Sequence, residues 1–216
     1  MKAIFERSNR LLALPLNTGP RFLLLIAALL LVPTYLTPLW KMTMFAPQYP
    51  GGLRLGIYSY KLESGNAGQD VKEINLLNHY IGMKELTTEE FTEFKWIPFV
   101  IGMLALLFLR AVAHGKMSDL VDVSALYLYF ALFSLWSFGY KLYSYGHNLA
   151  PTASVKVPPF MPPLFGHKKL ANFEVYSYPA GGSYVLAAVA VLLVGALVMA
   201  WLQSRSEQAL EARSAG

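Results

Sequence analysis

The chain has 216 residues, a formal net charge of +5 and no cysteine, and 55% of its residues are hydrophobic while only 14% are charged. Soluble domains carry roughly 25% charged residues, so this composition indicates a membrane protein. The positive charge does not indicate nucleic-acid binding, because no basic stripe, glycine-rich phosphate loop or recognition-helix pattern accompanies it.

Four apolar stretches each approach the ~20 residues that cross a hydrocarbon core as a helix. We predict transmembrane helices over residues 22–40, 97–113, 123–140 and 184–202. The second stretch carries Arg110, whose long side chain can extend to the lipid headgroups. A cleaved signal peptide is the alternative for the first stretch. Its apolar run is too long, no A-x-A site follows it, and Pro33 and Pro38 favour a kinked helix that is retained.

The short basic segments predict the orientation of these helices. Basic residues precede the first helix, lie between the second and third, and follow the fourth: Lys2, Arg7, Arg10 and Arg21, then Arg110 and Lys116, then Arg205 and Arg213. An even number of spans places all of them on the cytoplasmic side, with both termini inside a bacterial cytoplasmic (inner) membrane. The outer aromatic belt would contain Trp40, Trp96 and Tyr140, and Trp201 would lie at the inner interface.

The expected fold is therefore an all-α membrane protein with four transmembrane helices and two structured extracytoplasmic loops. The expected segments are a cytoplasmic tail (1–21), the first helix (22–40), loop A (41–96), the second helix (97–113), a cytoplasmic link (114–122), the third helix (123–140), loop B (141–183), the fourth helix (184–202) and a cytoplasmic tail (203–216).

Loop A has the patterns of one strand and two helices. The alternation over Leu53–Glu63 predicts a half-buried strand. Asp70 and Glu73 form a capping-box pattern ahead of a helix over residues 71–81, which Gly82 would end in a left-handed conformation. Thr87 and Glu90 suggest a second capping box before a short helical turn.

Loop B is rich in proline and aromatic residues and shows little periodicity. We expect residues 148–163 to run extended across another surface, since proline supplies rigidity without backbone donors. Disorder is the alternative, and Phe160, Leu164 and Phe165 argue against it because they supply apolar surface to bury.

The histidines and methionines of the two outer loops form a candidate metal-binding set. Its members are His79, Met83, His147, Met42, Met44, Met161 and His167. Thioether and imidazole ligands suit Cu(I), and a site without thiols cannot form disulfides in an oxidising compartment. Zinc is less favoured without thiolates, and no C-x-x-C-H haem motif or nucleophile motif for hydrolysis occurs. The alternatives are a His79 that is exposed to solvent or hydrogen-bonded to loop B, and methionines that fill a core or face lipid.

Four stretches, APQYPGGLRLGIYSYKL, INLLNHYIGM, YSYGHNLAPTASVKVP and PPLFGHKKLANFEVYSYP, carry a resemblance to a known family. The chain resembles small four-span membrane proteins that are encoded beside the copper-handling accessory genes of bacterial nitrous oxide reductase clusters. The resemblance covers roughly Pro38 to Gly182 and implies a copper-linked role in which His79, Met83 and His147 matter. That family often has an aspartate where this chain has Ala150, so a role for that carboxylate does not carry over.

We therefore expect a non-enzymatic copper-binding or copper-relay accessory protein of the bacterial inner membrane. It would present Cu(I) to a periplasmic acceptor, which the resemblance suggests is nitrous oxide reductase. His79 and His147 would share one site with Met83. The alternative is a non-catalytic subunit of a larger membrane complex, such as a copper membrane monooxygenase or a respiratory oxidase. In that case the outer loops would form a docking surface for other subunits, since aromatic residues are enriched at interfaces.

Overall fold

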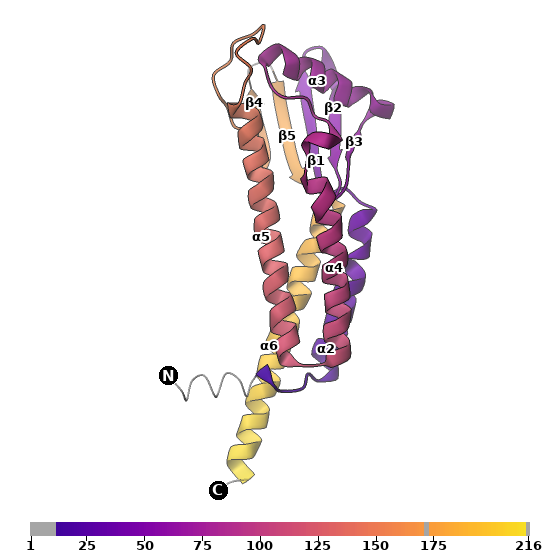
Figure 1. Ribbon diagram of the computed structural model, residues 1–216, viewed down its shortest axis with the longest axis vertical. Helices are drawn as coiled ribbons and strands as arrows, with labels where there is room; N and C mark the ends of the chain where they lie inside the picture. Colours follow the sequence, from indigo (N-terminus) through magenta and orange to yellow (C-terminus); the bar gives the residue numbers. More distant parts are fainter. Residues whose placement is uncertain (1–11, 171–172, 215–216) are drawn as a thin grey trace. The chain divides into compact units, whose positions relative to one another are not determined.

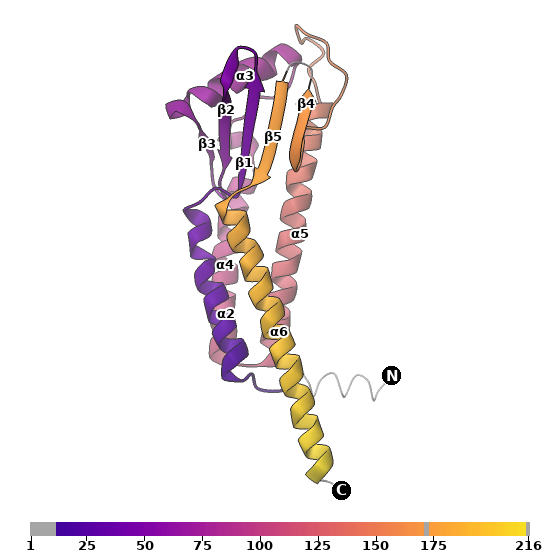
Figure 2. The same cartoon turned by 180° about the vertical axis from the view of Figure 1, so that it is seen from behind.

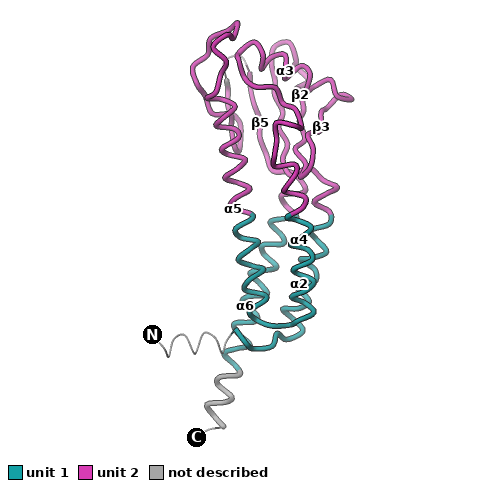
Figure 3. The backbone as a smooth tube through the Cα atoms, viewed as in Figure 1, with its two compact units in different colours: residues 1–32, 100–130, 185–216 teal, residues 33–99, 131–184 magenta. Residues whose placement is uncertain are grey.

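A computed structural model describes residues 12–170 and 173–214, and side chains over 12–169 and 173–206. Lys2, Arg7 and Arg10 lie outside the described residues, as does the side chain of Arg213. The chain divides into two compact units, unit 1 (residues 1–32, 100–130 and 185–216) and unit 2 (residues 33–99 and 131–184) (Figure 3). All of loop A and all of loop B belong to unit 2.

Within the described part of the chain, four helices are long and apolar enough to cross a membrane, which confirms the four predicted spans (Figure 1). They are α2 (Thr18–Leu30) with the 3-10 turn η1 (Val32–Tyr35), α4 (Glu93–His114), α5 (Met117–His147) and α6 (Gly181–Ser214). The first helix ends at Leu30, ahead of Pro33, because a proline inside a helix cannot donate the backbone hydrogen bond. The third continues to His147 rather than ending at Tyr140.

Unit 1 is a helical unit whose interior is apolar. Leu24, Ile101, Phe108 and Val189 are almost completely buried in it. The Nε atom of Arg21 donates a hydrogen bond of 2.9 Å to the carbonyl of Val112, a partner that satisfies one of the free carbonyls at the end of α4. The predicted cytoplasmic arginine therefore helps to close one end of this unit.

Unit 2 contains a five-stranded antiparallel sheet, so the all-α prediction was too narrow. The strand order is β3-β2-β1-β5-β4 (Figure 2). The strands are β1 (Trp40–Ala46), β2 (Tyr49–Ile57), β3 (Leu62–Ser64), β4 (Gly166–Leu170) and β5 (Phe173–Pro179). The predicted strand over Leu53–Glu63 is in fact parts of β2 and β3 joined by a turn. The centre of the sheet pairs β1 from loop A with β5 from loop B, which are more than 120 residues apart.

Helix α3 (Gln69–Ile81) packs Ile74 against Leu53 and Leu55 of β2. Figures 1 and 2 show that α3 lies on one face of the sheet, while no helix of unit 2 lies over the other face. Gly82 ends the helix with φ of 77°, which confirms the predicted left-handed cap.

Neither predicted capping box forms. The carboxylate of Asp70 instead accepts hydrogen bonds from the backbone N–H of Arg54 at 2.9 Å and from the Asn66 side chain at 2.7 Å. Asp70 is 2% exposed, so it joins the start of α3 to β2 rather than capping its own helix. Thr87 also makes no side-chain cap at the 3-10 turn η3 (Thr88–Glu90).

Residues 148–163 have no regular secondary structure, as predicted, and they are held by backbone hydrogen bonds. The N–H of Ala150 donates to the carbonyl of Gly82 at 2.8 Å, and that of Val155 donates to Tyr80 at 2.9 Å. Further along, the N–H of Phe160 donates to the carbonyl of Gly146 at 3.0 Å. This segment therefore runs from the end of α3 back to the end of α5.

Candidate functional site

Unit 2 contains a partly open cavity of about 250 Å³ on the helix-covered face of its sheet. Its walls come from the sheet, from α3, from residues 83–91, from the outer part of α5 and from residues 157–162. Almost all of these side chains are apolar, and among them are Leu53, Ile74, Leu142 and Val175. An apolar hollow with few polar groups is the usual form of a ligand-binding site in a protein.

Three methionines line this cavity, namely Met42, Met44 and Met83. Met42 and Met44 are two residues apart on β1, so the pleat directs both to the same face of the sheet. Antiparallel pairing sets Met42 beside Leu55 and Met44 beside Leu53, which are also cavity residues. Met83 arrives from another direction, because the left-handed turn at Gly82 redirects the chain directly after α3.

The few polar groups at the cavity are already hydrogen-bonded to neighbouring backbone. The Tyr145 hydroxyl donates to the carbonyl of Glu85 at 3.1 Å, and Lys141 Nζ donates to that of Glu90 at 3.0 Å. Asn78, which is 3% exposed, points its amide at the carbonyl of Lys84 at 3.4 Å. These groups therefore position the cavity wall, and the space itself remains apolar.

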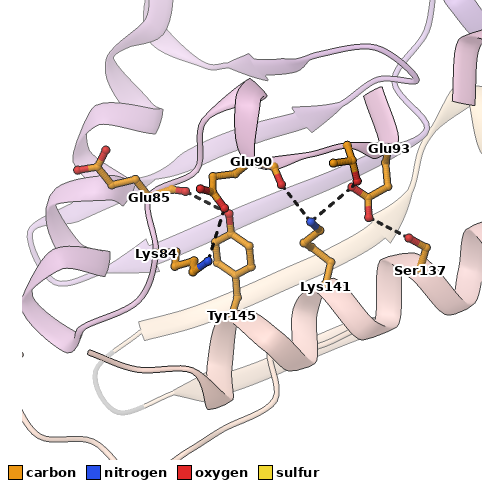
Figure 4. A network of polar contacts seen from close by, with 8 residues as sticks. Lys84, Glu85, Glu90, Glu93, Ser137, Lys141 and Tyr145 are labelled. Atoms are coloured by element: carbon orange, nitrogen blue, oxygen red, sulfur yellow. Dashed lines mark hydrogen bonds and ion pairs between the residues drawn. The ribbon is translucent and has the colours of Figure 1, made fainter. Parts of the chain in front are cut away.

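Residues 84–93 form one wall of the cavity, and a polar network joins this wall segment to α5 (Figure 4). Lys141 Nζ lies 3.5 Å from a carboxylate oxygen of Glu93, whose other oxygen accepts a bond of 2.9 Å from Ser137. Lys141 also lies 5.2 Å from the ring centroid of Phe91, a cation–π distance. The network keeps Leu86 and Phe91 against the cavity.

The wall segment is also bound to α3 through Asn75. The Asn75 carbonyl oxygen accepts a bond of 2.7 Å from the Leu86 N–H, and its amide donates to the Leu86 carbonyl at 3.3 Å. The Asn75 side chain thus pairs with both backbone polar groups of Leu86, as a neighbouring strand would. The wall segment is fixed on both sides, by α3 and by α5.

A tyrosine–carboxylate contact lies where β2 meets α3. The hydroxyl of Tyr49 donates a short hydrogen bond to Glu73, which also accepts one of 2.8 Å from Gln69. The hydrogen bond from Tyr49, and secondly that from Gln69, lowers the pKa of Glu73 below its ordinary value. The same contact raises the pKa of Tyr49. The two hydrogen bonds therefore favour the charged form of Glu73.

The predicted histidine ligands do not line the cavity. His79 is exposed on α3. His147 stacks on Tyr143 with ring centroids 3.8 Å apart and directs Nδ1 to the Tyr143 carbonyl at 3.0 Å. His167 on β4 is exposed and stacks on Tyr176 of β5. Met161 also falls outside the cavity lining.

The segments that carry His79 and His147 do come together, through the hydrogen bond between Ala150 and Gly82. A site shared by the two imidazoles stays a prediction.

Most of the cavity side chains are apolar, and they include three thioethers. Thioether sulfurs are neutral, polarisable donors of the kind that Cu(I) accepts. Among the described residues, no group of three or more histidine, cysteine, aspartate or glutamate side chains is placed to hold a metal ion. Of the seven predicted ligands, Met42, Met44 and Met83 line the cavity, and copper binding by them stays a prediction.

The methionines of β1 could be noticed in the sequence as Met42-x-Met44, but their partners could not. Leu55 and Val175 join them only through pairings with β2 and β5. Lys141 and Tyr145 were assigned to loop B, and only the continuation of α5 brings them to the wall segment. The sequence signal for this network was the spacing of Lys141 and Tyr145, two polar residues four positions apart at the end of an apolar helix.

A comparison with protein-family models, curated proteins and solved structures finds no match for this chain.

Proposed function

We propose that this protein is a copper-binding accessory protein of a bacterial inner membrane, which holds Cu(I) through Met42, Met44 and Met83. One observation carries the proposal: these three thioethers, from β1 and from the turn after α3, line the same cavity. Neutral sulfur donors in an apolar, thiol-free pocket favour Cu(I) over divalent hard cations.

The proposed orientation puts unit 2 in the periplasm. The short segments with Arg21, Lys116 and Arg205 belong to unit 1, and clusters of basic residues favour the cytoplasmic side. A Cu(I) site in unit 2 would then face a periplasmic acceptor. The resemblance suggests nitrous oxide reductase as that acceptor, and this part of the proposal rests on the resemblance alone.

The role of the chain would be to bind and release the ion without redox chemistry of its own. Each thioether is a weak ligand, so a site made of three gives moderate affinity and permits transfer to a stronger site. His79 lies on the surface near the same end of α3 and is a candidate first contact for the ion.

The test is a Cu(I) competition titration of the purified full chain with a chromophoric chelator. Single Met42→Leu, Met44→Leu and Met83→Leu variants should each weaken binding on the order of tenfold or more, the scale of changes around a metal ligand set. Leucine is close to methionine in volume, so the fold should tolerate these changes. The matched control is Met161→Leu, which should leave the affinity unchanged.

A sulfur shell in the X-ray absorption spectrum of the copper-loaded protein should weaken in the same three variants. Unchanged affinity in the triple methionine variant would refute the proposed ligands. If only His79→Ala and His147→Ala reduce binding, the site is the histidine site predicted from the sequence. If the protein binds no Cu(I) and is purified with stoichiometric partners, the accessory-subunit alternative is favoured.

A further inference from the structure

The turn between β2 and β3 is formed by four residues, Tyr58, Ser59, Tyr60 and Lys61, here called the tyrosine turn. The N–H of Tyr58 donates to the carbonyl of Lys61 at 2.9 Å, which closes the turn. Tyr60 is 42% exposed, and its ring centroid lies 6.1 Å from that of Tyr58. The turn therefore presents two neighbouring aromatic rings on the surface of unit 2.

A cation lies over both rings. Lys61 Nζ is 4.8 Å from the Tyr58 ring centroid and 5.8 Å from that of Tyr60. The same Nζ forms an ion pair of 3.0 Å with Glu63, which also accepts a bond of 2.7 Å from the Tyr58 hydroxyl. The charges of Lys61 and Glu63 thus balance each other. The surface of the turn is then formed mainly by tyrosine rings and their hydroxyl groups.

Backbone hydrogen bonds fix the tyrosine turn at the level where two spans end. Ile57, the residue before the turn, accepts a bond of 2.7 Å from the Leu39 N–H. Leu39 in turn accepts one of 2.9 Å from the N–H of Ala180, directly before α6. Leu39 follows the first candidate span by only four residues, since that span ends at Tyr35.

The strand directions place the turn on the membrane side of this level. β1 leaves the first span and begins at Trp40, which is paired with Ile57 at the end of β2. Because β1 and β2 are antiparallel, β2 runs back toward the span, and the turn extends beyond Ile57 in that direction. Leu36 is 76% exposed and Tyr184 is 64% exposed at the adjoining ends of the spans, as expected of side chains that contact lipid.

We propose that the tyrosine turn is a lipid-headgroup anchor, a contact between unit 2 and the outer surface of the bilayer. Tyrosine is favoured at this depth because its ring enters the apolar region while its hydroxyl stays in the polar one. The turn would add a fixed contact outside the helices to the aromatic belt expected from Trp40, Trp96 and Tyr140. It would set the height of the cavity above the membrane.

The ligand class is a phospholipid headgroup of either charge. The Lys61–Glu63 pair neutralises the turn, so an anionic lipid gains little over a zwitterionic one. This distinguishes the anchor from a polybasic segment, whose binding requires anionic lipid. An alternative occupant is a polypeptide partner, which would cover the same rings.

Photo-crosslinking of the full chain in vesicles tests the proposal. Benzoylphenylalanine replaces Tyr60 in one variant and keeps an aromatic ring in place. The matched control replaces Val155, which is 50% exposed and hydrogen-bonded to the end of α3. After irradiation in phosphatidylcholine vesicles, mass spectrometry should show lipid adducts at position 60 at about tenfold the yield at position 155. Adding phosphatidylglycerol should change the yield less than about twofold.

Three results would overturn the proposal. Equal lipid yields at positions 60 and 155 would mean that the turn has no preferred contact with the bilayer. A crosslink to another polypeptide in native membranes, with no lipid adduct, would assign the rings to a protein interface. Lipid adducts that appear only with phosphatidylglycerol would show that charge, and not the aromatic pair, binds the membrane. Gel filtration of both variants checks that each retains the native fold.

Discussion

Unit 2 buries polar groups that unit 1 largely lacks. Among the described residues, five of the six buried polar side chains belong to unit 2, and only Ser204 belongs to unit 1. The five are Thr34, Ser59, Asp70, Asn78 and Ser177. A buried polar group stabilises a fold only while its partner is in place, whereas apolar packing tolerates small shifts. Asp70, Asn78 and Ser177 of unit 2 have such hydrogen-bond partners, so unit 2 depends more than unit 1 on individual polar contacts.

The largest effect should come from Gly82→Val, which disrupts one contact of unit 2. Gly82 has φ of 77°, and a Cβ there would lie 2.9 Å from the backbone N and O of Ala150. A β-branched residue in this conformation, against a neighbour that cannot move freely, should cost about 2–3 kcal/mol of unit 2 stability. Limited proteolysis should then cut residues 148–163 faster, while the helical circular dichroism of the spans persists.

Gly51→Ala is the matched control, because a Cβ at Gly51 meets no atom within 4 Å. Gly65 is unsuitable for this purpose, since its Cβ would collide with the Asp70 carboxylate. Equal protease resistance of the Gly82 and Gly51 variants would show that the contact with Ala150 does not hold unit 2 together.

A medium effect is expected when the polar network of the wall segment is broken. Lys141→Met removes the bond to Glu90 and leaves Glu93, whose side chain is 15% exposed, without its cation. Loss of a partly buried charged hydrogen bond costs about 1–3 kcal/mol. Hydrogen exchange measured by mass spectrometry should therefore speed up over residues 84–93 and stay unchanged in unit 1.

Lys84→Met is the control for the network, because it breaks a different ion pair of the same segment. Lys84 and Glu90 are 3.7 Å apart with side chains 60% and 48% exposed, and exposed pairs contribute about 0–1 kcal/mol. Similar exchange rates in the Lys84 and Lys141 variants would mean that the wall segment is held by apolar contacts instead.

The difference between apolar packing in unit 1 and individual contacts in unit 2 also explains which features could be predicted from the sequence. The spans were predicted because one requirement, an apolar stretch of sufficient length, determines each of them. Gly82 was predicted as a cap because its cause is local. The sheet was only partly predicted, since Met42 becomes a strand residue by pairing with Leu55 and with Ser177, and the second partner is 135 positions away. The histidines were predicted as metal ligands from their residue type alone. Residue type does not indicate which side chains share a cavity, as Met42, Met44 and Met83 do.

The smallest effect concerns pH and the contact between β2 and α3. The Tyr49 hydroxyl, and less strongly Gln69, lowers the pKa of Glu73 in the folded protein. A carboxyl whose pKa is lower when folded stabilises the fold at pH values above its unfolded pKa. That stabilisation is lost as the pH falls through the folded value. Helix α3 of the native chain should therefore lose hydrogen-exchange protection steadily as the pH is lowered below the ordinary glutamate pKa of about 4.3.

Tyr49→Phe removes the donor with the larger influence, so the pKa of Glu73 should rise toward its ordinary value and the acid-dependent loss should shrink. Gln69→Ala removes the donor with the smaller influence and should give an intermediate pH dependence. The measurement is the hydrogen-exchange protection of α3 between about pH 6 and pH 3, corrected for the intrinsic rate at each pH. Identical pH profiles for the native chain and Tyr49→Phe would separate Glu73 from the stability of unit 2. The polar contacts that matter would then be those of Asp70 and of the wall segment.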